Sequence, residues 1–249
     1  MIITLPNEKK IDLKDGLDIS IPLTDDESNP RAWYVDYPKF VPVRNKDWVG
    51  VVKEGGAVNF RDIYFNPHGH GTHTECLGHI TPEVYSVNKL LNNYFFSARL
   101  VSIKPQKFVQ SGQVDFIIMA DQLEKALGEN NCEAVVIRTL PNDLDKKSKN
   151  YSASNPPYMH TDCLEILDKL GVKHLLIDLP SVDRELDGGV LAFHHAFWGV
   201  PDNPQYDKTI TEFIYVPSEI KDGDYLLNLQ VAPFENDASP SRPVLYKEF

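Results

Sequence analysis

The chain has 249 residues, of which 42% are hydrophobic and 24% are charged, a balance typical of a globular protein. Its 36 acidic and 25 basic residues give a formal charge of −11, which disfavours binding to nucleic acid or to an anionic membrane surface. We therefore expect a small-molecule partner, with no nucleic-acid and no membrane partner.

The first half of the chain shows two short strand patterns and one helix. Residues 18–23 alternate apolar and polar side chains, and residues 100–103 form a short mixed run. Segment 115–127 contains the end of a strand followed by a helix, because residues 120–127 are mostly good helix formers. We expect both short strands to have antiparallel neighbours.

The clearest unit is a strand–helix–strand pattern between residues 133 and 179. Residues 134–139 and 174–178 are short apolar runs of the kind that buried strands show. A polar stretch follows the first run, and its lysine-rich part, residues 146–150, is expected at the surface. The spacing predicts a right-handed crossover and at least one parallel pair of strands.

The helix of this unit has recognisable ends. Asp162 is its predicted N-cap, Glu165 completes a capping box, and Gly171 ends the helix. A last strand is predicted at residues 225–231. Because strands outnumber helices and no repeat or domain boundary is visible, we expect an α/β fold with a mixed sheet in a single domain, residues 1–249.

The cysteines and the N-terminus indicate the compartment. Cys76, Cys132 and Cys163 are odd in number and form no C-x-x-C pair, so we expect reduced thiols. The sequence lacks a signal peptide pattern and a run of eighteen apolar residues. A cytoplasmic protein is expected.

Half of the eight histidines lie within the twelve residues 68–79, together with Glu75. His73 and Glu75 are two residues apart, so in an extended segment both side chains point to one face and can share an ion. The glycines before them allow His68 or His70 to fold back to the same ion. Imidazole with carboxylate suits Zn, Mn or Fe, whereas Cys76 faces the other way and is expected to pack.

A histidine-rich loop can also cap turns or form a metal patch without a physiological role. Two adjacent histidines, His194 and His195, lie further along in an apolar aromatic run. Alone, such a pair suggests one buried histidine and one that faces solvent. Two histidine clusters in one chain favour convergence on one site.

The segment Gly71-Thr-His73-Thr-Glu75-Cys-Leu-Gly-His79 resembles the H-x-G-T-H-x-D-x-P-x-H motif of the cyclase-like metal-dependent hydrolases. That family includes bacterial kynurenine formamidase (arylformamidase) and isatin hydrolase. The similarity extends over roughly residues 18–246, including residues 176–183. It implies a swivelling β/β/α-type fold, a divalent transition metal, Zn or Mn, with one or two ions per chain, and a homodimer or homotetramer.

The resemblance also implies roles for individual residues. His73 and Glu75 would be ligands, with Glu75 bridging two ions, and His194 with Glu212 would complete the shell of the second ion. His79 would be the general acid or base.

Three positions depart from the motif. Gly69 stands where the family has its leading histidine, so His68 or His70 would replace that ligand; we favour His68, because a loop containing glycines accommodates an extra residue. Glu75 replaces an aspartate and reaches further. Leu77 replaces the proline.

The implied reaction is hydrolysis of a formamide, an aryl amide or a cyclic amide, a non-peptide carbon–nitrogen bond. The metal would activate water, and His79 would pass a proton to the leaving amine, a task suited to an imidazole because its reference pKa is about 6.5. A dehydrating cyclase and a non-catalytic protein that binds metal or a small molecule are the alternatives.

Two groups have unsettled roles. The aromatic side chains between Trp33 and Phe40 could line a substrate pocket or pack in the core, and so could Phe197 and Trp198. Ser181 and Asp183 either orient a ligand histidine or cap the next turn.

Overall fold

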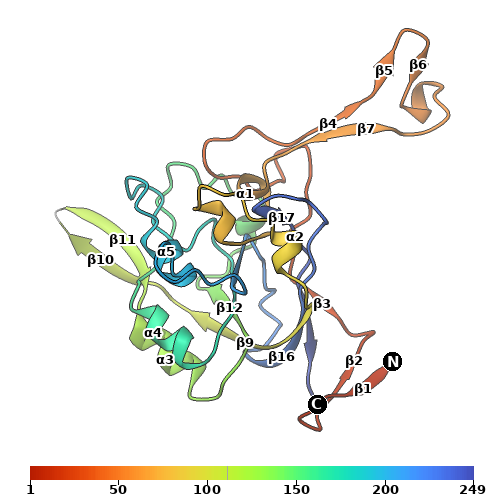
Figure 1. Cartoon of the computed structure of the whole chain (residues 1–249). Helices are drawn as coiled ribbons and strands as arrows, with labels where there is room; N and C mark the ends of the chain where they lie inside the picture. The colour runs from red at the N-terminus through yellow and green to blue at the C-terminus, as the bar shows by residue number, and fades with distance from the viewer. Residues whose placement is uncertain (111) are drawn as a thin grey trace.

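The computed structural model describes residues 1–110 and 112–249, and its centre is a nine-stranded mixed sheet (Figure 1). The order across the sheet, with the bounds of each strand, is β17 (Ala238–Pro240), β8 (His73–Glu75), β15 (Thr209–Glu212), β14 (His174–Ile177), β12 (Ala134–Thr139), β9 (Phe95–Ile103), β16 (Gly223–Asn228), β18 (Val244–Lys247) and β3 (Leu17–Asp18). The expected α/β class with a mixed sheet is confirmed.

The predicted crossover is present. β12 and β14 pair in parallel, with Ala134 opposite His174, and all their residues are buried. Helix α4 (Cys163–Lys169) connects them, as expected. Asp162 is the N-cap residue of α4, as predicted, but its side chain makes no capping hydrogen bond: it is 69% exposed and lies 3.4 Å from His160 Nδ1.

The flanking strands are antiparallel as expected, with two corrections. β16 pairs antiparallel with β9 and β18, and β18 with β3. The run 100–103 is the end of the nine-residue β9, which also pairs in parallel with β12. The predicted strand 18–23 stops at Asp18, because the Asp18 carboxylate accepts hydrogen bonds from the Ser20 backbone and hydroxyl, and Pro22 has no N–H to donate.

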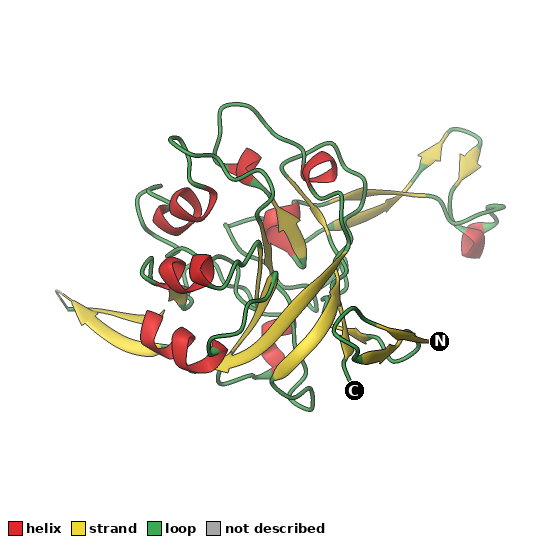
Figure 2. Ribbon diagram, turned by 60° about the horizontal axis from the view of Figure 1, so that its bottom comes forward, coloured by secondary structure: helices red, strands yellow, loops and turns green. Residues whose placement is uncertain are grey.

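Short helices surround the sheet (Figure 2). Helix α3 follows a strand end as predicted and packs on β9 and α4. The α-helices besides α4 are α1 (Pro67–His70), α2 (Val87–Leu90), α3 (Ala120–Leu127) and α5 (Ala192–Trp198); the 3₁₀ helices are η1 (Val52–Glu54), η2 (Leu77–His79) and η3 (Leu144–Lys147).

Two hairpins extend from the body in Figure 1. The first, which we call the arm (residues 39–64), is built from β4 (Lys39–Pro42) paired with β7 (Arg61–Tyr64) and carries β5 (Arg44–Asn45), β6 (Trp48–Val49) and η1. The second consists of β10 (Gln106–Gln110) and β11 (Gln113–Ile118), with β13 (Tyr158–Met159) beside β11. A terminal pair, β1 (Ile2–Thr4) and β2 (Lys10–Asp12), completes the strands of the described residues.

The expectation that residues 146–150 lie at the surface is wrong for Lys146. Its side chain is 12% exposed, and its Nζ donates to Asp178 Oδ2 at 2.9 Å and to the Thr139 carbonyl and hydroxyl. The Asp178 side chain is fully buried, and a buried carboxylate is costly without a positive partner. The Lys146 ammonium group from the neighbouring loop provides that partner.

The three cysteines are free, in agreement with the expectation of reduced thiols. Among the described residues, no helix is both long enough and apolar enough to span a membrane.

Candidate metal centre

The centre is built around β8, which lies between β15 and β17. In the antiparallel register, His73 is opposite Glu212 on β15 and opposite Pro240 on β17. His73 and Glu75 share one face of β8, as the two-residue spacing predicts. His73 Nε2 lies 3.5 Å from Glu212 Oε2, so β8 and β15 together bring one imidazole and two carboxylates to the same place.

The structure brings His68, not His70, into the cluster. Both lie on α1, whose N-cap Asn66 accepts a hydrogen bond from the Gly69 N–H. Residues two apart on a helix are rotated by about 200°, so the two imidazoles point in opposite directions. His68 Nδ1 lies 3.0 Å from Glu75 Oε2, whereas His70 Nδ1 accepts from the Asn66 N–H.

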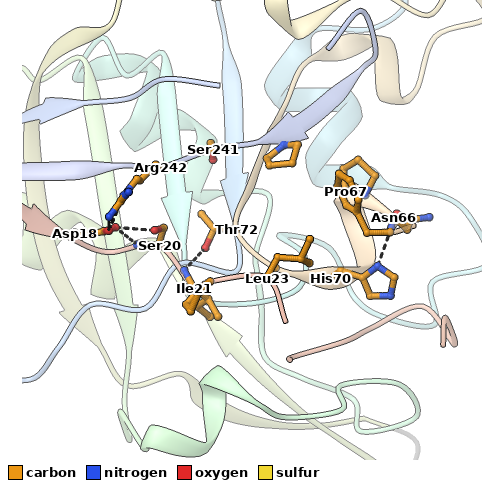
Figure 3. A pocket seen from close by; sticks show the side chains of 14 residues that line it. Asp18, Ser20, Ile21, Leu23, Asn66, Pro67, His70, Thr72, Ser241 and Arg242 are labelled. Atoms are coloured by element: carbon orange, nitrogen blue, oxygen red, sulfur yellow. Dashed lines mark hydrogen bonds and ion pairs between the residues drawn. The ribbon is translucent and has the colours of Figure 1, made fainter. Parts of the chain in front are cut away.

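His70 instead lines the wall of a cavity of about 500 Å³ next to the centre (Figure 3). The cavity is lined by apolar residues such as Ile21 and Phe65 and by polar ones such as Asp18 and Arg242, and the residues around it in the described chain include none of the cluster's ionisable side chains. We therefore place the chemistry at the cluster and not in this cavity.

The glycine at position 69 has a steric cause. A Cβ built on Gly69 would lie 2.8 Å from Val35 Cγ2 and 3.4 Å from the Ala32 carbonyl oxygen. A side chain at this position would collide with Val35, so the imidazole is supplied by His68, the residue before it.

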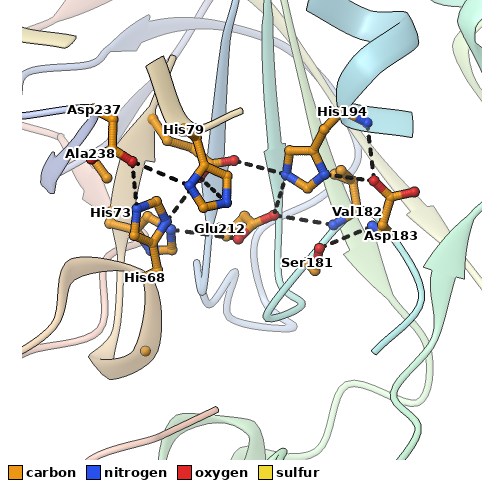
Figure 4. A network of polar contacts seen from close by, with 12 residues as sticks. His68, His73, His79, Ser181, Val182, Asp183, His194, Glu212, Asp237 and Ala238 are labelled. Carbon is orange, nitrogen blue, oxygen red and sulfur yellow. Dashed lines mark hydrogen bonds and ion pairs between the residues drawn. The ribbon is translucent and has the colours of Figure 1, made fainter. Parts of the chain in front are cut away.

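The second histidine pair separates as its sequence suggested. His194 on α5 is buried, and its Nε2 lies 3.0 Å from Glu75 Oε1 and 3.9 Å from Glu212 Oε1. His195 turns away, with Nδ1 3.3 Å from the Val200 carbonyl oxygen. The two histidine clusters of the sequence thus converge on one site (Figure 4).

Asp183 both orients His194 and caps α5. Its Oδ2 accepts a hydrogen bond from His194 Nδ1 at 2.6 Å, and its two oxygens also accept from the backbone N–H groups of Phe193 and His194. Ser181 Oγ accepts from the Asp183 N–H, so both roles considered for these residues apply.

His79 occupies the more open side of the cluster. Its side chain is 30% exposed, compared with 1% for Glu75, and its Nε2 lies 3.9 Å from Glu75 Oε2. Two groups therefore have donor atoms close enough to hold an ion: His73, Glu75 and Glu212, and His68, Glu75 and His79. Glu75 belongs to both groups.

The charge balance of the cluster calls for a cation. Glu75 and Glu212 are almost fully buried, and within the described chain all their ion-pair partners are histidines. Buried carboxylates are costly unless positive charge accompanies them. That charge has to come from protons on the histidines or from a bound ion.

An unsatisfied atom supports an ion. In the described part of the chain, His73 Nε2 is buried without a hydrogen-bond partner. His73 Nδ1 donates to the Gly71 carbonyl oxygen, so in the neutral ring Nε2 carries a lone pair that faces a carboxylate. Two acceptors facing each other inside a protein fit a divalent metal, and imidazole with carboxylate is a donor set of the transition metals.

The pKa values of the metal-free protein report the same electrostatics. Burial lowers the pKa of His68 and of His194, but carboxylates outweigh burial and raise both values to about 10: Asp237 and Glu75 act on His68, and Asp183 and Glu75 on His194. Burial lowers the pKa of His73 to about 4. Burial and the neighbouring Glu75 raise the pKa of Glu212 well above its usual value. Protons supply the charge when metal is absent.

Three of the aromatic candidates, Trp33, Phe197 and Trp198, serve packing, whereas Tyr34 is 65% exposed. Phe197 and Trp198 are buried in the main core, and Trp198 Nε1 donates to the Lys208 carbonyl. Trp33 packs on the small cluster of Ala32, Tyr151 and Phe213, and the Phe213 ring lies 6.2 Å from the His73 ring.

One site residue, Asp237, escaped the sequence reasoning. Its Oδ2 lies 2.8 Å from His68 Nε2 and 3.3 Å from His79 Nδ1. No motif surrounds it in the sequence. It reaches the cluster because it precedes β17, and the pairing of β17 with β8 only becomes visible in the fold.

Comparison with known families identifies relatives over most of the chain. Residues 17–184 match the family model described as "Putative cyclase". Kynurenine formamidase of Bacillus cereus is 26% identical over 238 residues, covering 93% of this chain and 97% of that protein. Kynurenine formamidase of Bacillus thuringiensis is 28% identical over 236 residues, with the same coverage.

Solved structures share the fold at low identity. An isatin hydrolase bound to the product analogue thioisatinate aligns with a TM-score of 0.63 and 16% identity, covering 94% of this chain and 93% of that chain. A potential metal-dependent hydrolase with cyclase activity aligns with a TM-score of 0.64 and 15% identity, covering 93% and 97%.

Proposed function

Because the chain belongs to the cyclase family, we propose that it is a metal-dependent hydrolase that cleaves a non-peptide carbon–nitrogen bond. The observation that carries this proposal is the buried cluster around Glu75, in which two groups of donor atoms share one carboxylate. The relatives' names support the bond type, since they specify a formamidase and an isatin hydrolase. The proposed substrates are a formamide, an aryl amide or a cyclic amide.

We assign His68, His73, Glu75, His194 and Glu212 as the ligands of one or two ions, with Glu75 shared. Zn and Mn are the proposed metals, because both accept mixed imidazole and carboxylate ligands. When bound, the ion supplies Lewis acidity that activates water and polarises the scissile carbonyl.

We assign His79 as the proton carrier. It is more exposed than the buried histidines of the cluster, which leaves it accessible to a substrate, and its Nε2 faces the shared carboxylate. Its ring can accept a proton from the attacking water and deliver it to the leaving amine. Asp183 holds His194 in place during this exchange.

The rival proposals use the same site. A dehydrating cyclase needs the same proton carrier, and a binding protein needs the metal alone. The test is to load chelator-treated protein with Zn or Mn and to assay an aryl formamide, a simple aryl amide and a cyclic amide. Metal-dependent release of amine or opening of the ring supports the hydrolase; tight binding without turnover of any substrate supports the binding protein.

We also propose that two copies of the chain associate through the arm. Its exposed apolar side chains include Val41, Phe60, Ile63 and Tyr64. The arm carries five Lys or Arg and three Asp or Glu, a net charge of +2, so the rest of the chain carries −13. A basic, apolar arm is complementary to the acidic body of a second copy.

A further inference from the structure

The side chain of Asp237 joins two histidines that have different proposed tasks. One oxygen, Oδ2, lies 2.8 Å from Nε2 of His68 and 3.3 Å from Nδ1 of His79. The two rings stack, with centroids 4.1 Å apart and planes 25° apart. A single carboxylate oxygen is thus the common partner of His68, a proposed metal ligand, and His79, the proposed proton carrier (Figure 4).

The backbone around Asp237 fixes its position. The Cys76 N–H donates to the Asp237 carbonyl oxygen at 3.1 Å, and Ala238, the next residue, is paired with Glu75 in the β17–β8 register. The Asp237 side chain is 15% exposed. The same strand that carries Glu75 therefore positions the carboxylate on the far side of both imidazoles.

Donor and acceptor chemistry then determines which ring nitrogens carry hydrogen. An ionised carboxylate only accepts, so the nitrogens that face Asp237 must be N–H groups. In each neutral ring the other nitrogen keeps its lone pair. These are Nδ1 of His68 and Nε2 of His79, and both face Glu75 Oε2, at 3.0 Å and 3.9 Å.

The other two histidines of the cluster follow the same rule with different acceptors. His73 donates from Nδ1 to the Gly71 carbonyl oxygen, and His194 donates from Nδ1 to Asp183. Each then presents Nε2 to the cluster. His68 differs, because its outer acceptor lies at Nε2 and it presents Nδ1 instead. An outer hydrogen bond of this kind sets the tautomer and the orientation of a metal-binding histidine.

We propose that Asp237 is a positioning residue that fixes the tautomers of both His68 and His79. The lone pair of His68 is then presented to the metal, and the lone pair of His79 is available to the proton of the attacking water. The proposal rests on the proposed function for the two tasks. The contact of Asp237 with both histidines rests only on the measured distances to its Oδ2. One carboxylate thereby determines both the nitrogen that His68 offers to the metal and the nitrogen of His79 that can accept a proton.

The test combines Asp237→Asn with a matched control. An asparagine has the same shape but no charge, so its amide oxygen accepts the two ring N–H groups more weakly than Oδ2 does, and its amide nitrogen, if turned towards the rings, cannot accept at all. Asp115→Asn is the control: Asp115 is 13% exposed, similar to Asp237, and it pairs with Arg184 and with no histidine of the cluster.

Two measurements on zinc-loaded protein report on position and do not depend on turnover. Long-range ¹H–¹⁵N spectra of the histidine rings should show the wild-type protein with hydrogen on Nε2 of His68 and on Nδ1 of His79. In Asp237→Asn we expect loss of at least one of these patterns and roughly 10- to 100-fold weaker zinc binding. Asp115→Asn should retain both, and Asp237→Glu should recover part of the affinity.

Opposite tautomers of His68 and His79 in the wild-type protein would overturn the proposal, even if Asp237→Asn failed to fold. So would a folded Asp237→Asn that keeps both tautomers and the wild-type zinc affinity. An inactive wild-type enzyme with these tautomers would instead contradict the proposed function and leave the role of Asp237 supported, since neither readout needs a substrate.

Discussion

His194 Nε2 lies 3.0 Å from Glu75 Oε1, although 119 residues separate the two side chains in the sequence. The contact joins β8 to α5 and makes one site of two histidine clusters. Because Glu75 also faces His68 and His79 through its other oxygen, this glutamate is the centre on which the electrostatics of the site depend.

Metal binding should release protons. His68 and His194, whose pKa values are about 10 in the metal-free protein, carry a proton at pH 7 that an ion must displace. We expect affinity to rise with pH below 10, by about tenfold per pH unit for each proton released. Calorimetric titration with Zn²⁺ in buffers of different ionisation enthalpy measures the number of protons.

The stability of the metal-free fold should depend on pH in the opposite direction to the metal affinity. The two histidines contribute stability that is complete below their unfolded pKa of about 6.5 and is lost as the pH rises through about 10. In the metal titration, proton uptake on Zn²⁺ binding, or a Zn²⁺ affinity that falls between pH 6 and pH 9, would contradict the charges assigned to the two histidines.

Replacing His79 with glutamine should separate binding from turnover. If His79 carries the proton, His79→Gln loses roughly 10²- to 10⁴-fold in kcat and keeps the wild-type metal content. Elemental analysis and steady-state kinetics on the same preparation measure both. His195→Gln, which changes the adjacent histidine outside the cluster, is the control. A His79→Gln protein that loses an ion would make His79 a ligand.

Breaking the Lys146–Asp178 pair should destabilise the fold. Lys146→Met leaves the fully buried Asp178 without its ammonium partner, and we expect a loss of about 3 to 5 kcal/mol in the free energy of unfolding. Lys173→Met breaks an exposed pair with Asp207 and should cost about 1 kcal/mol or less. Urea unfolding of both variants gives the comparison, and equal losses would show that the buried pair has no special weight.

Self-association through the arm should depend on its apolar surface. Ile63 is 53% exposed, so Ile63→Glu should leave the fold intact and weaken association at least about tenfold. Light scattering coupled to size-exclusion chromatography measures the mass. Leu144→Glu changes a residue that is 73% exposed and lies outside the arm, and it should keep the wild-type mass. A wild-type protein that runs as a monomer at high micromolar concentration would rule out this interface.

Local patterns predicted the parts of the fold that depend on neighbours in the sequence. The β12–α4–β14 unit follows from hydrophobic runs, and the shared face of His73 and Glu75 follows from a spacing of two in a strand. The choice between His68 and His70 could not be made in this way. It depends on α1 being helical, and a spacing of two that aligns side chains in a strand separates them in a helix.

The positions of Asp237 and Lys146 could not be predicted from the sequence, because both depend on contacts between residues far apart in the chain. Asp237 enters the cluster only through the β17–β8 register, and Lys146 is buried only because a charged Asp178 lies beneath its loop. Neither contact leaves a local pattern in the sequence.

The most direct test of the central claim is to titrate metal-free protein with Zn²⁺ or Mn²⁺ while following hydrolysis of an aryl formamide or a cyclic amide in the same sample. We predict that the rate is close to zero without metal, rises in proportion to the bound ion, and stops rising at one or two ions per chain. In Glu75→Gln, which removes the shared carboxylate, no ion should restore the rate. Hydrolysis that is independent of metal, or that survives in Glu75→Gln with full metal content, would contradict the claim.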